Sequence, residues 1–252
     1  MITIKSEREI ELMRHAGMLV SEMHQFIKPY IKAGISTKEL DALCEKFILD
    51  HEAVPTCKGY EGFPAALCTS LNDVVVHGIP HEEDVLKDGD IITIDVVIGY
   101  KGYQGDAAWT YTVGEVDEDK QYLMEHTEKA LYVGVEQVKP GNRIGDISSA
   151  IQKYAEEHHL GVVRELCGHG IGAEMHEEPE VPNFGIPNTG AVLKPGMVIC
   201  IEPILTFGKR DVYQLDDGWT VKTWDHSPAA HYEHTVLVTE DGYEILTPRL
   251  DD

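Results

Sequence analysis

The segment Leu193-Lys-Pro-Gly-Met-Val-Ile-Cys-Ile-Glu202 has a counterpart earlier in the chain, Leu86-Lys-Asp-Gly-Asp-Ile-Ile-Thr-Ile-Asp95. In both copies a Lys-x-Gly turn leads into a short apolar strand, and the strand ends in one carboxylate. A carboxylate in such a place is costly to bury unless a cation or hydrogen bonds compensate its charge. Two related strands that each deliver one acid therefore predict a metal site between two similar halves.

The same offset in numbering (202 − 95 = 107) relates a second pair of segments, 33–41 and 140–148. Each segment follows one apolar helical stretch and opens another. Chance similarity is the weaker explanation, because the offset holds without a gap across separated segments. A solenoid is excluded because its repeat unit would be far shorter. We predict an α/β fold of the α+β type, with one catalytic domain over residues 1–252 and halves of about 1–115 and 116–252.

The bulk properties of the chain exclude several classes of protein. Its 252 residues can bury a large core, its formal net charge of −23 repels polyanions, and no apolar run is long enough to cross a bilayer. The five scattered cysteines form no Cys-x-x-Cys pair, which indicates neither a disulfide framework nor a zinc ribbon. The first residues lack the features of a secretory signal. We expect a cytoplasmic protein that binds neither nucleic acid nor membranes.

Local patterns predict where the helices and strands lie. Two capping boxes, Ser6-Glu-Arg-Glu9 and Ser36-Thr-Lys-Glu39, predict the starts of two amphipathic helices. Further helices are predicted at about residues 121–138 and 146–157. Strands are predicted at residues 106–113, 162–166 and 231–239, the last followed by a hairpin.

Five side chains are predicted to point inward at the ends or flanks of this β-structure: Asp95, Asp106, His169, Glu202 and Glu233. A turn at residues 100–105 lets the first two face each other across a hairpin. One imidazole with four carboxylates suits a pair of divalent cations such as manganese, iron, cobalt or zinc, not a lone structural zinc. Bridging carboxylates hold two such ions about 3.5–4 Å apart. The alternative is a set of unrelated surface acids and a core histidine.

Several motifs together resemble the type I methionine aminopeptidases of bacteria, in the family's order over nearly the whole chain. They are His77-Gly-Ile-Pro80, Asp95, Gly105-Asp106, Cys167-Gly-His169-Gly-Ile-Gly172, His176-Glu-Glu-Pro179, Ile201-Glu202-Pro203 and Tyr232-Glu233-His234-Thr235. The resemblance implies the pita-bread fold, in which two pseudo-symmetric halves of helices and antiparallel strands surround a dinuclear metal site.

The resemblance also implies a role for each motif residue. Asp95 would ligate one metal ion and His169 the other, together with Glu202, while Asp106 and Glu233 would bridge the two. The ions, which would be cobalt, manganese, iron, zinc or nickel, activate a water for metal-assisted hydrolysis. Glu202 would handle the proton of that water. The resemblance further implies that His176 contacts the scissile carbonyl and that His77 lies near the substrate amide.

The family's methionine pocket corresponds here to a set of sulfur-containing, aromatic and imidazole side chains: Cys57, Tyr60, Phe63, Cys68, His77, Met175, His176 and Trp219. Plain core packing is the alternative for the cysteines and Phe63. Two positions depart from the family pattern. Met175 stands where an aromatic is common, and His231 replaces a glutamine. Because strand alternation puts His231 on the same face as Glu233, we expect it to hydrogen-bond near the metal ions.

The function that the resemblance implies is removal of the initiator methionine from nascent polypeptides when the second residue is small. This activity places the substrate near the ribosome, and we expect the enzyme to act as a monomer. Two alternatives remain open at this point. One is a proline-directed aminopeptidase or dipeptidase of the same fold, and the other is a non-catalytic binding protein of that fold that lost its metals.

Overall fold

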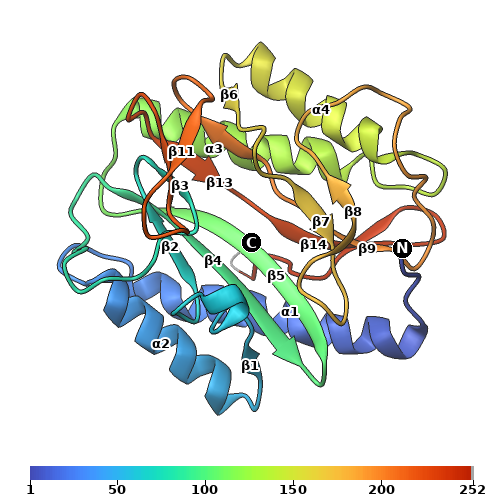
Figure 1. The fold of residues 1–252 in the computed structure, drawn as a ribbon, viewed down its shortest axis with the longest axis horizontal. Helices are drawn as coiled ribbons and strands as arrows, with labels where there is room; N and C mark the ends of the chain where they lie inside the picture. The colour runs from blue at the N-terminus through green and yellow to red at the C-terminus, as the bar shows by residue number, and fades with distance from the viewer. Residues whose placement is uncertain (251–252) are drawn as a thin grey trace.

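The computed structural model describes residues 1–250, in which two pairs of helices flank the strands (Figure 1). In the view of Figure 1, α1 and α2 lie along the lower edge and α3 and α4 toward the top. The α-helices are α1 (Glu7–Ile27), α2 (Thr37–Asp50), α3 (Glu118–Val135) and α4 (Ile144–Glu157), and short 3-10 helices span Lys28–Tyr30 and Tyr60–Gly62.

The strands form four antiparallel sheets. The first contains β1 (Val54–Pro55), β4 (Ile91–Tyr100), β2 (Cys68–Leu71) and β5 (Tyr103–Thr112). The largest contains β15 (Tyr243–Ile245), β14 (His234–Val238), β9 (Val198–Ile201), β7 (Gly168–Gly170) and β8 (Glu177–Val181). A third sheet contains β13 (Ala229–His231), β10 (Ile204–Thr206) and β6 (Gly161–Val162). A fourth contains β11 (Val212–Gln214), β12 (Val221–Thr223) and β3 (Val74–Val76).

The offset that relates the two halves of the sequence recurs in the three-dimensional structure. Helices α2 and α4 both have 14 residues, and their first residues differ by the same offset (144 − 37 = 107). Strands β4 and β9 also begin at positions related by it (198 − 91 = 107). Two isolated β-bridges follow the same rule, Ser36 with Val85 and Arg143 with Val192. The predicted pseudo-symmetric α+β fold is therefore confirmed.

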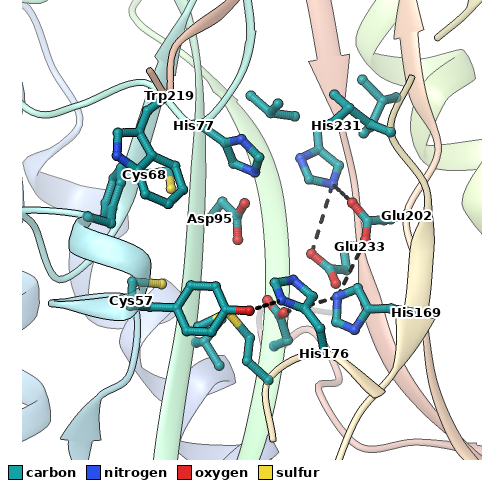
Figure 2. A pocket seen from close by; sticks show the side chains of 18 of the residues that line it. Cys57, Cys68, His77, Asp95, His169, His176, Glu202, Trp219, His231 and Glu233 are labelled. Atoms are coloured by element: carbon teal, nitrogen blue, oxygen red, sulfur yellow. Dashed lines mark hydrogen bonds and ion pairs between the residues drawn. The ribbon is translucent and has the colours of Figure 1, made fainter. Parts of the chain in front are cut away.

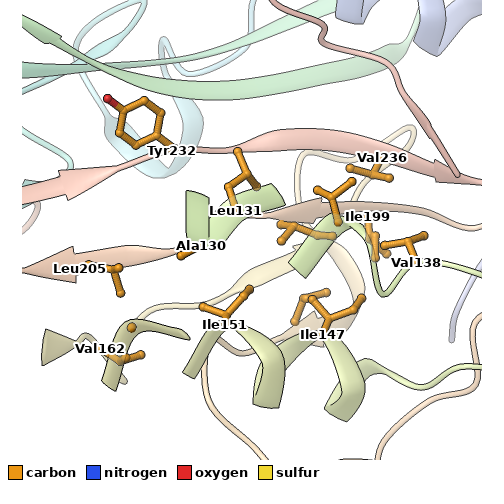
Figure 3. Packing of buried hydrophobic residues seen from close by; sticks show 14 of the residues in the cluster. Ala130, Leu131, Val138, Ile147, Ile151, Val162, Ile199, Leu205, Tyr232 and Val236 are labelled. Carbon is orange, nitrogen blue, oxygen red and sulfur yellow. The ribbon is translucent and has the colours of Figure 1, made fainter. Parts of the chain in front are cut away.

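Each pair of helices covers its own apolar core. One core lies between α1, α2 and the β4–β5 hairpin, and the other between α3, α4 and the strands of the second half (Figure 3). In the second core, Leu131 of α3 and Ile151 of α4 pack with Ile199 of β9. Helix α1 approaches β5 so closely that a Cβ atom at Gly105 would lie 2.6 Å from the backbone nitrogen of Gly17. This contact fixes the chain immediately before Asp106.

The helix starts follow the predicted capping chemistry. The Ser6 and Ser36 side chains each accept a hydrogen bond from the amide three residues on, and both capping boxes are complete. Helix α3 begins three residues before the predicted start because the Asp117 side chain caps it by accepting from Lys120 N. The predicted strand at residues 162–166 is wrong in extent, since β6 ends at Val162 and the chain then turns toward the pocket.

One of the two acid-bearing strands ends differently from the prediction. Asp95 lies within β4, not at its end, because β4 continues to Tyr100 and into the hairpin with β5. Glu202 does follow the end of β9, and Pro203 after it lacks the N–H that a continuing ladder would need. The predicted strand at residues 231–239 is interrupted at Tyr232 and Glu233, which separate β13 from β14.

No helix within residues 1–250 combines the length and apolar character needed to cross a lipid bilayer.

Candidate metal centre

A pocket of about 280 Å³ lies between the two halves, and all five predicted ligands line it. Figure 2 shows Asp95 on one side and His169, Glu202 and Glu233 on the other. All eight predicted pocket residues line the same cavity. The structure therefore brings together every side chain that was predicted from the sequence to form the site.

The β4–β5 hairpin places Asp95 and Asp106 on one face. In the register of the two strands, Asp95 pairs with Ala108 and Asp106 pairs with Val97. The two acids are therefore diagonal neighbours, not directly opposite partners, and diagonal side chains are still within reach of one another.

Backbone contacts attach this hairpin to the second half of the chain. The Asp106 N–H donates to Thr235 Oγ1 at 3.1 Å, and the Thr235 hydroxyl donates to the Asp106 carbonyl at 2.8 Å. The Glu233 N–H donates to the Ala108 carbonyl at 2.8 Å. The interruption between β13 and β14 thus frees the Glu233 amide to bond across to the first half, which positions its side chain beside Asp106.

His169 is oriented by a contact with the backbone of its own strand, β7. Its Nδ1 lies 2.8 Å from the Gly170 carbonyl, so Nδ1 carries the proton and Nε2 keeps a free lone pair. That Nε2 lies 3.7 Å from Asp106 Oδ2 and 3.6 Å from Glu202 Oε1. Burial lowers the pKa of His169 to about 4, so the ring is neutral at physiological pH. This is the form of histidine that binds a metal ion.

The carboxyl groups of the site repel one another in a water-poor environment. Burial raises the pKa of all four carboxyls, and neighbouring acids raise those of Asp106, Glu202 and Glu233 further. Asp106 Oδ1 and Glu233 Oε1 are buried without a hydrogen-bond partner among the described residues. Buried oxygens with neither a proton donor nor a cation are unfavourable, so these residues fit the binding of divalent metal.

One wall of the pocket is apolar and rich in sulfur. Cys57, Phe63, Cys68 and Met175 are buried there in one cluster. The Trp219 ring meets Phe63 edge-on, with the ring centroids 5.2 Å apart. Such a wall suits an unbranched, polarisable side chain.

Two further histidines face the pocket. His77 follows the end of β3 with a φ of 57°, a left-handed conformation that is uncommon for a residue with a Cβ. Burial lowers its pKa to about 4, and the nearby His231 and His176 contribute to this shift. His176 Nδ1 lies 2.9 Å from the Tyr60 hydroxyl. This hydrogen bond joins the 3-10 helix Tyr60–Gly62 of the first half to a loop of the second across the pocket (Figure 2).

His231 lies where strand alternation predicted, on the ligand-bearing side. Its Nε2 is 3.2 Å from Glu202 Oε2 and 3.9 Å from Glu233 Oε2, and the residue is 2% exposed. Burial lowers its pKa, so the ring is neutral. Nε2 is within hydrogen-bonding distance of Glu202, although no described residue offers it an aligned hydrogen bond.

Two buried residues beside the site were not singled out from the sequence. The Asn183 amide donates to the Glu202 carbonyl at 2.9 Å, a contact that only the tertiary structure reveals. The thiol of Cys200 lies close to Asp106, His169 and Glu233. Its position two residues before Glu202 on a strand was a signal that could have found it, because residues i and i+2 share a face.

Comparisons with known proteins agree with this geometry. Residues 11–240 match the sequence profile described as Metallopeptidase family M24. The chain is 51% identical to methionine aminopeptidase 1 of Bacillus subtilis, over 98% of this chain and 99% of that protein. The crystal structure of methionine aminopeptidase from Rickettsia prowazekii superposes with a TM-score of 0.97 and 44% identity, covering 98% of this chain and 100% of that one.

A more distant structure shares the fold alone. Prolidase from Pyrococcus furiosus superposes with a TM-score of 0.77 at 24% identity, over 97% of this chain but only 65% of the prolidase.

Proposed function

The chain belongs to metallopeptidase family M24, and from this premise we propose that it is a methionine aminopeptidase. In this proposal it hydrolyses the peptide bond that follows an N-terminal methionine. The observation that carries the proposal is the meeting of five metal-binding side chains with a sulfur-rich apolar wall in one pocket. The near-complete coverage of the similar aminopeptidases supports it.

Two divalent cations would be held by the donors of this pocket. Asp95 would ligate one and His169 with Glu202 the other, while Asp106 and Glu233 bridge them. Bound there, the ions polarise the scissile carbonyl and lower the pKa of a water molecule. The donor set contains mainly oxygen atoms, which suits manganese, iron, cobalt, nickel and zinc ions alike.

Glu202 is the residue that transfers the proton of the attacking water. Glu202 directly follows the end of β9, and its carboxyl group lies beside His169 and 3.2 Å from His231. Burial and the charge of Asp95 raise its pKa, which makes it a better base than a solvated glutamate. It can take a proton from the attacking water and pass it to the leaving amine.

His176 binds the carbonyl oxygen that becomes negatively charged during hydrolysis. If the Tyr60 hydroxyl donates to His176 Nδ1, the proton of the neutral ring sits on Nε2. Nε2–H is then the donor for the developing oxyanion. His77, at the opposite wall near Trp219, would contact the substrate amide.

The wall formed by Cys57, Phe63, Cys68, Met175 and Trp219 would hold the methionine side chain. Tyr60, His77 and His176 would complete the pocket around it. We further propose that the second residue of the substrate must be small, that the enzyme acts on nascent polypeptides close to the ribosome, and that it works as a monomer.

The two alternatives have less support. Prolidases share the fold at 24% identity and extend well beyond the matched region, whereas the methionine aminopeptidase of Bacillus subtilis matches end to end at 51%. A non-catalytic relative would be expected to have lost ligands, yet all five predicted donors are present and face one cavity.

Cleavage of three peptides tests the proposal. Purified protein with added Mn²⁺ or Co²⁺ should release methionine from Met-Ala-Ser, with no preference for a matched peptide that has proline in second place. Release from Ala-Ala-Ser should be slower by an order of magnitude or more, since the sulfur-rich wall would be empty. Preferential cleavage of the proline peptide, or no cleavage with any divalent ion, would overturn the assignment.

A further inference from the structure

A sulfur atom that the hydrolytic role does not use lies behind the carboxylates of the pocket. The Cys200 thiol, one carboxylate oxygen each of Asp106 and Glu233, and one ring nitrogen of His169 all lie within 4.8 Å of one another. All four residues are buried. Cys200 therefore belongs to the floor of the proposed metal centre as well as to the apolar core beneath it.

Strand geometry explains why the thiol faces the site. Cys200 precedes Glu202 by two residues in the same extended segment, and it pairs with Thr235 of β14. Thr235 in turn holds the backbone of Asp106. Cys200 Sγ lies 3.7 Å from Thr235 Oγ1, and the residue has no exposed surface. Because of this packing, the sulfur has little freedom to turn away from the carboxylates.

The four donors match the ligand set of a tetrahedral site. One sulfur, one imidazole nitrogen and two carboxylate oxygens bind Zn²⁺ at about 2.0–2.3 Å, which places neighbouring donors roughly 3.5 Å apart. Donors already within 4.8 Å need to close by about 1 Å. Two of these residues also have an oxygen that points to a cation, because Asp106 Oδ1 and Glu233 Oε1 are buried with no hydrogen-bond partner in residues 1–250.

We propose that Cys200 gives the centre a second binding mode, specific for strongly thiophilic divalent cations such as Cd²⁺. In this mode the cation is ligated by Cys200 Sγ, His169, Asp106 and Glu233. The thiol proton leaves to solvent as the sulfur–metal bond forms. The proposal rests on the proposed function, which supplies the metal centre itself.

This second mode is inhibitory. Asp106 and Glu233 are the two carboxylates that would bridge the hydrolytic pair of ions. A cation bound to the sulfur draws both of them toward the floor of the pocket, away from Asp95. Hard ions such as Mn²⁺ prefer oxygen and gain little from a thiol. The same set of donors therefore distinguishes hard ions, which activate the enzyme, from soft ions, which inhibit it.

The test compares Cd²⁺ with Mn²⁺ on metal-free protein. Titration of wild type with Cd²⁺ should produce a sulfur-to-cadmium charge-transfer absorption in the ultraviolet, and Cys200→Ser should lack it. By calorimetry, Cys200→Ser should weaken Cd²⁺ binding at least about tenfold while Mn²⁺ binding changes about threefold or less. Cys44→Ser, which alters a buried thiol in the other core, is the matched control and should behave as wild type.

Two results would overturn the inference: a Cd²⁺ titration of wild type without the charge-transfer band, or equal Cd²⁺ affinity in wild type and Cys200→Ser. The wild-type spectrum needs no variant, so a poorly folding substitution leaves the test intact, and Cys200→Thr provides a second variant. Failure of the proposed function is seen separately, as absence of Met-Ala-Ser cleavage by wild type with Mn²⁺.

Discussion

Asp95 and Asp106 lie diagonally across the β4–β5 hairpin, because Asp95 pairs with Ala108 while Asp106 pairs with Val97. Direct opposition would have forced two like charges together at one position of the ladder. The diagonal offset instead leaves space between the carboxylates, and the donors from the second half face that space. This arrangement suits ligands to neighbouring cations better than a shared-proton pair of acids.

Asp106→Asn should abolish turnover and leave the fold intact. Asparagine keeps the size of the side chain and the backbone contacts with Thr235, but a neutral amide cannot bridge two cations as a carboxylate does. We expect at least about a thousandfold loss of kcat on Met-Ala-Ser. Circular dichroism should match wild type. Retained activity would contradict the bridging role.

Removal of divalent ions should lower the melting temperature of wild type, and their return should restore it. Ions that bind only the folded chain stabilise it, by about 2.7 kcal/mol per site at a concentration of one hundred times Kd. Differential scanning fluorimetry with chelator and then Mn²⁺ measures this shift. In Asp106→Asn the shift should shrink, and the metal-free variant should be at least as stable as metal-free wild type, since one buried acid is gone.

His231→Gln should weaken metal binding and change the pH–rate profile. His231 Nε2 lies 3.2 Å from Glu202 Oε2, so the imidazole constrains a carboxylate that we propose both ligates a cation and carries a proton. Groups in such positions commonly change metal affinity 10–100-fold, and we expect about tenfold. Calorimetric titration with Mn²⁺ measures it, and His126→Gln is the control, since His126 of α3 contacts Tyr154 of α4 and does not line the pocket. Unchanged affinity and an unchanged profile would show that His231 only fills space.

Tyr60→Phe should lower kcat more than it raises KM. The substitution removes the hydroxyl 2.9 Å from His176 Nδ1 but keeps the ring in the pocket wall. Without that donor the His176 proton is no longer fixed on the nitrogen that faces the carbonyl oxygen, and one hydrogen bond is worth about 1 kcal/mol. We expect a loss of kcat of roughly five- to tenfold. A change confined to KM would assign Tyr60 to substrate binding alone.

Acid should destabilise the protein through His24. This histidine is fully buried between α1 and β5, with Nδ1 2.8 Å from the Tyr111 hydroxyl and its ring stacked on Trp109. Burial lowers its pKa from 6.5 to about 3, and the charge of Arg249 opposes protonation too. The unfolded chain therefore binds this proton first as pH falls. Stability present above pH 6.5 is lost progressively between about pH 6.5 and 3.

Denaturant unfolding at several pH values measures that loss. His24→Gln should flatten the dependence by up to about 1.4 kcal/mol per pH unit, which corresponds to one proton. The wild-type slope includes His234 as well, since burial also lowers its pKa to about 3. An equal slope in wild type and variant would mean that His24 does not contribute.

Much of this fold could be predicted because its signals are local or repeated. The two capping boxes marked the starts of α1 and α2, and the constant offset between the halves identified the related strands β4 and β9. The five ligand positions followed from motifs, and all five line one cavity. Such features depend on side chains that lie close together in the sequence.

Other features depend on contacts between distant segments and left no local signal. The interruption at Tyr232 and Glu233 is stabilised by a bond to Ala108, which lies in the other half of the chain. The Tyr60–His176 hydrogen bond likewise arises only when the two halves meet, and β6 pairs with β10, more than forty residues later in the chain. Strand patterns alone could not place these boundaries.

The five proposed ligands are divided between the halves, with Asp95 and Asp106 from the first and His169, Glu202 and Glu233 from the second. Neither half by itself contains the full set of donors. The chain thus resembles a two-subunit enzyme whose subunits are joined in one polypeptide. Residues 113–117 form the connection, between β5 and α3. Covalent linkage replaces dimerisation by an intramolecular step at high effective concentration, so assembly of the centre does not depend on how dilute the protein is.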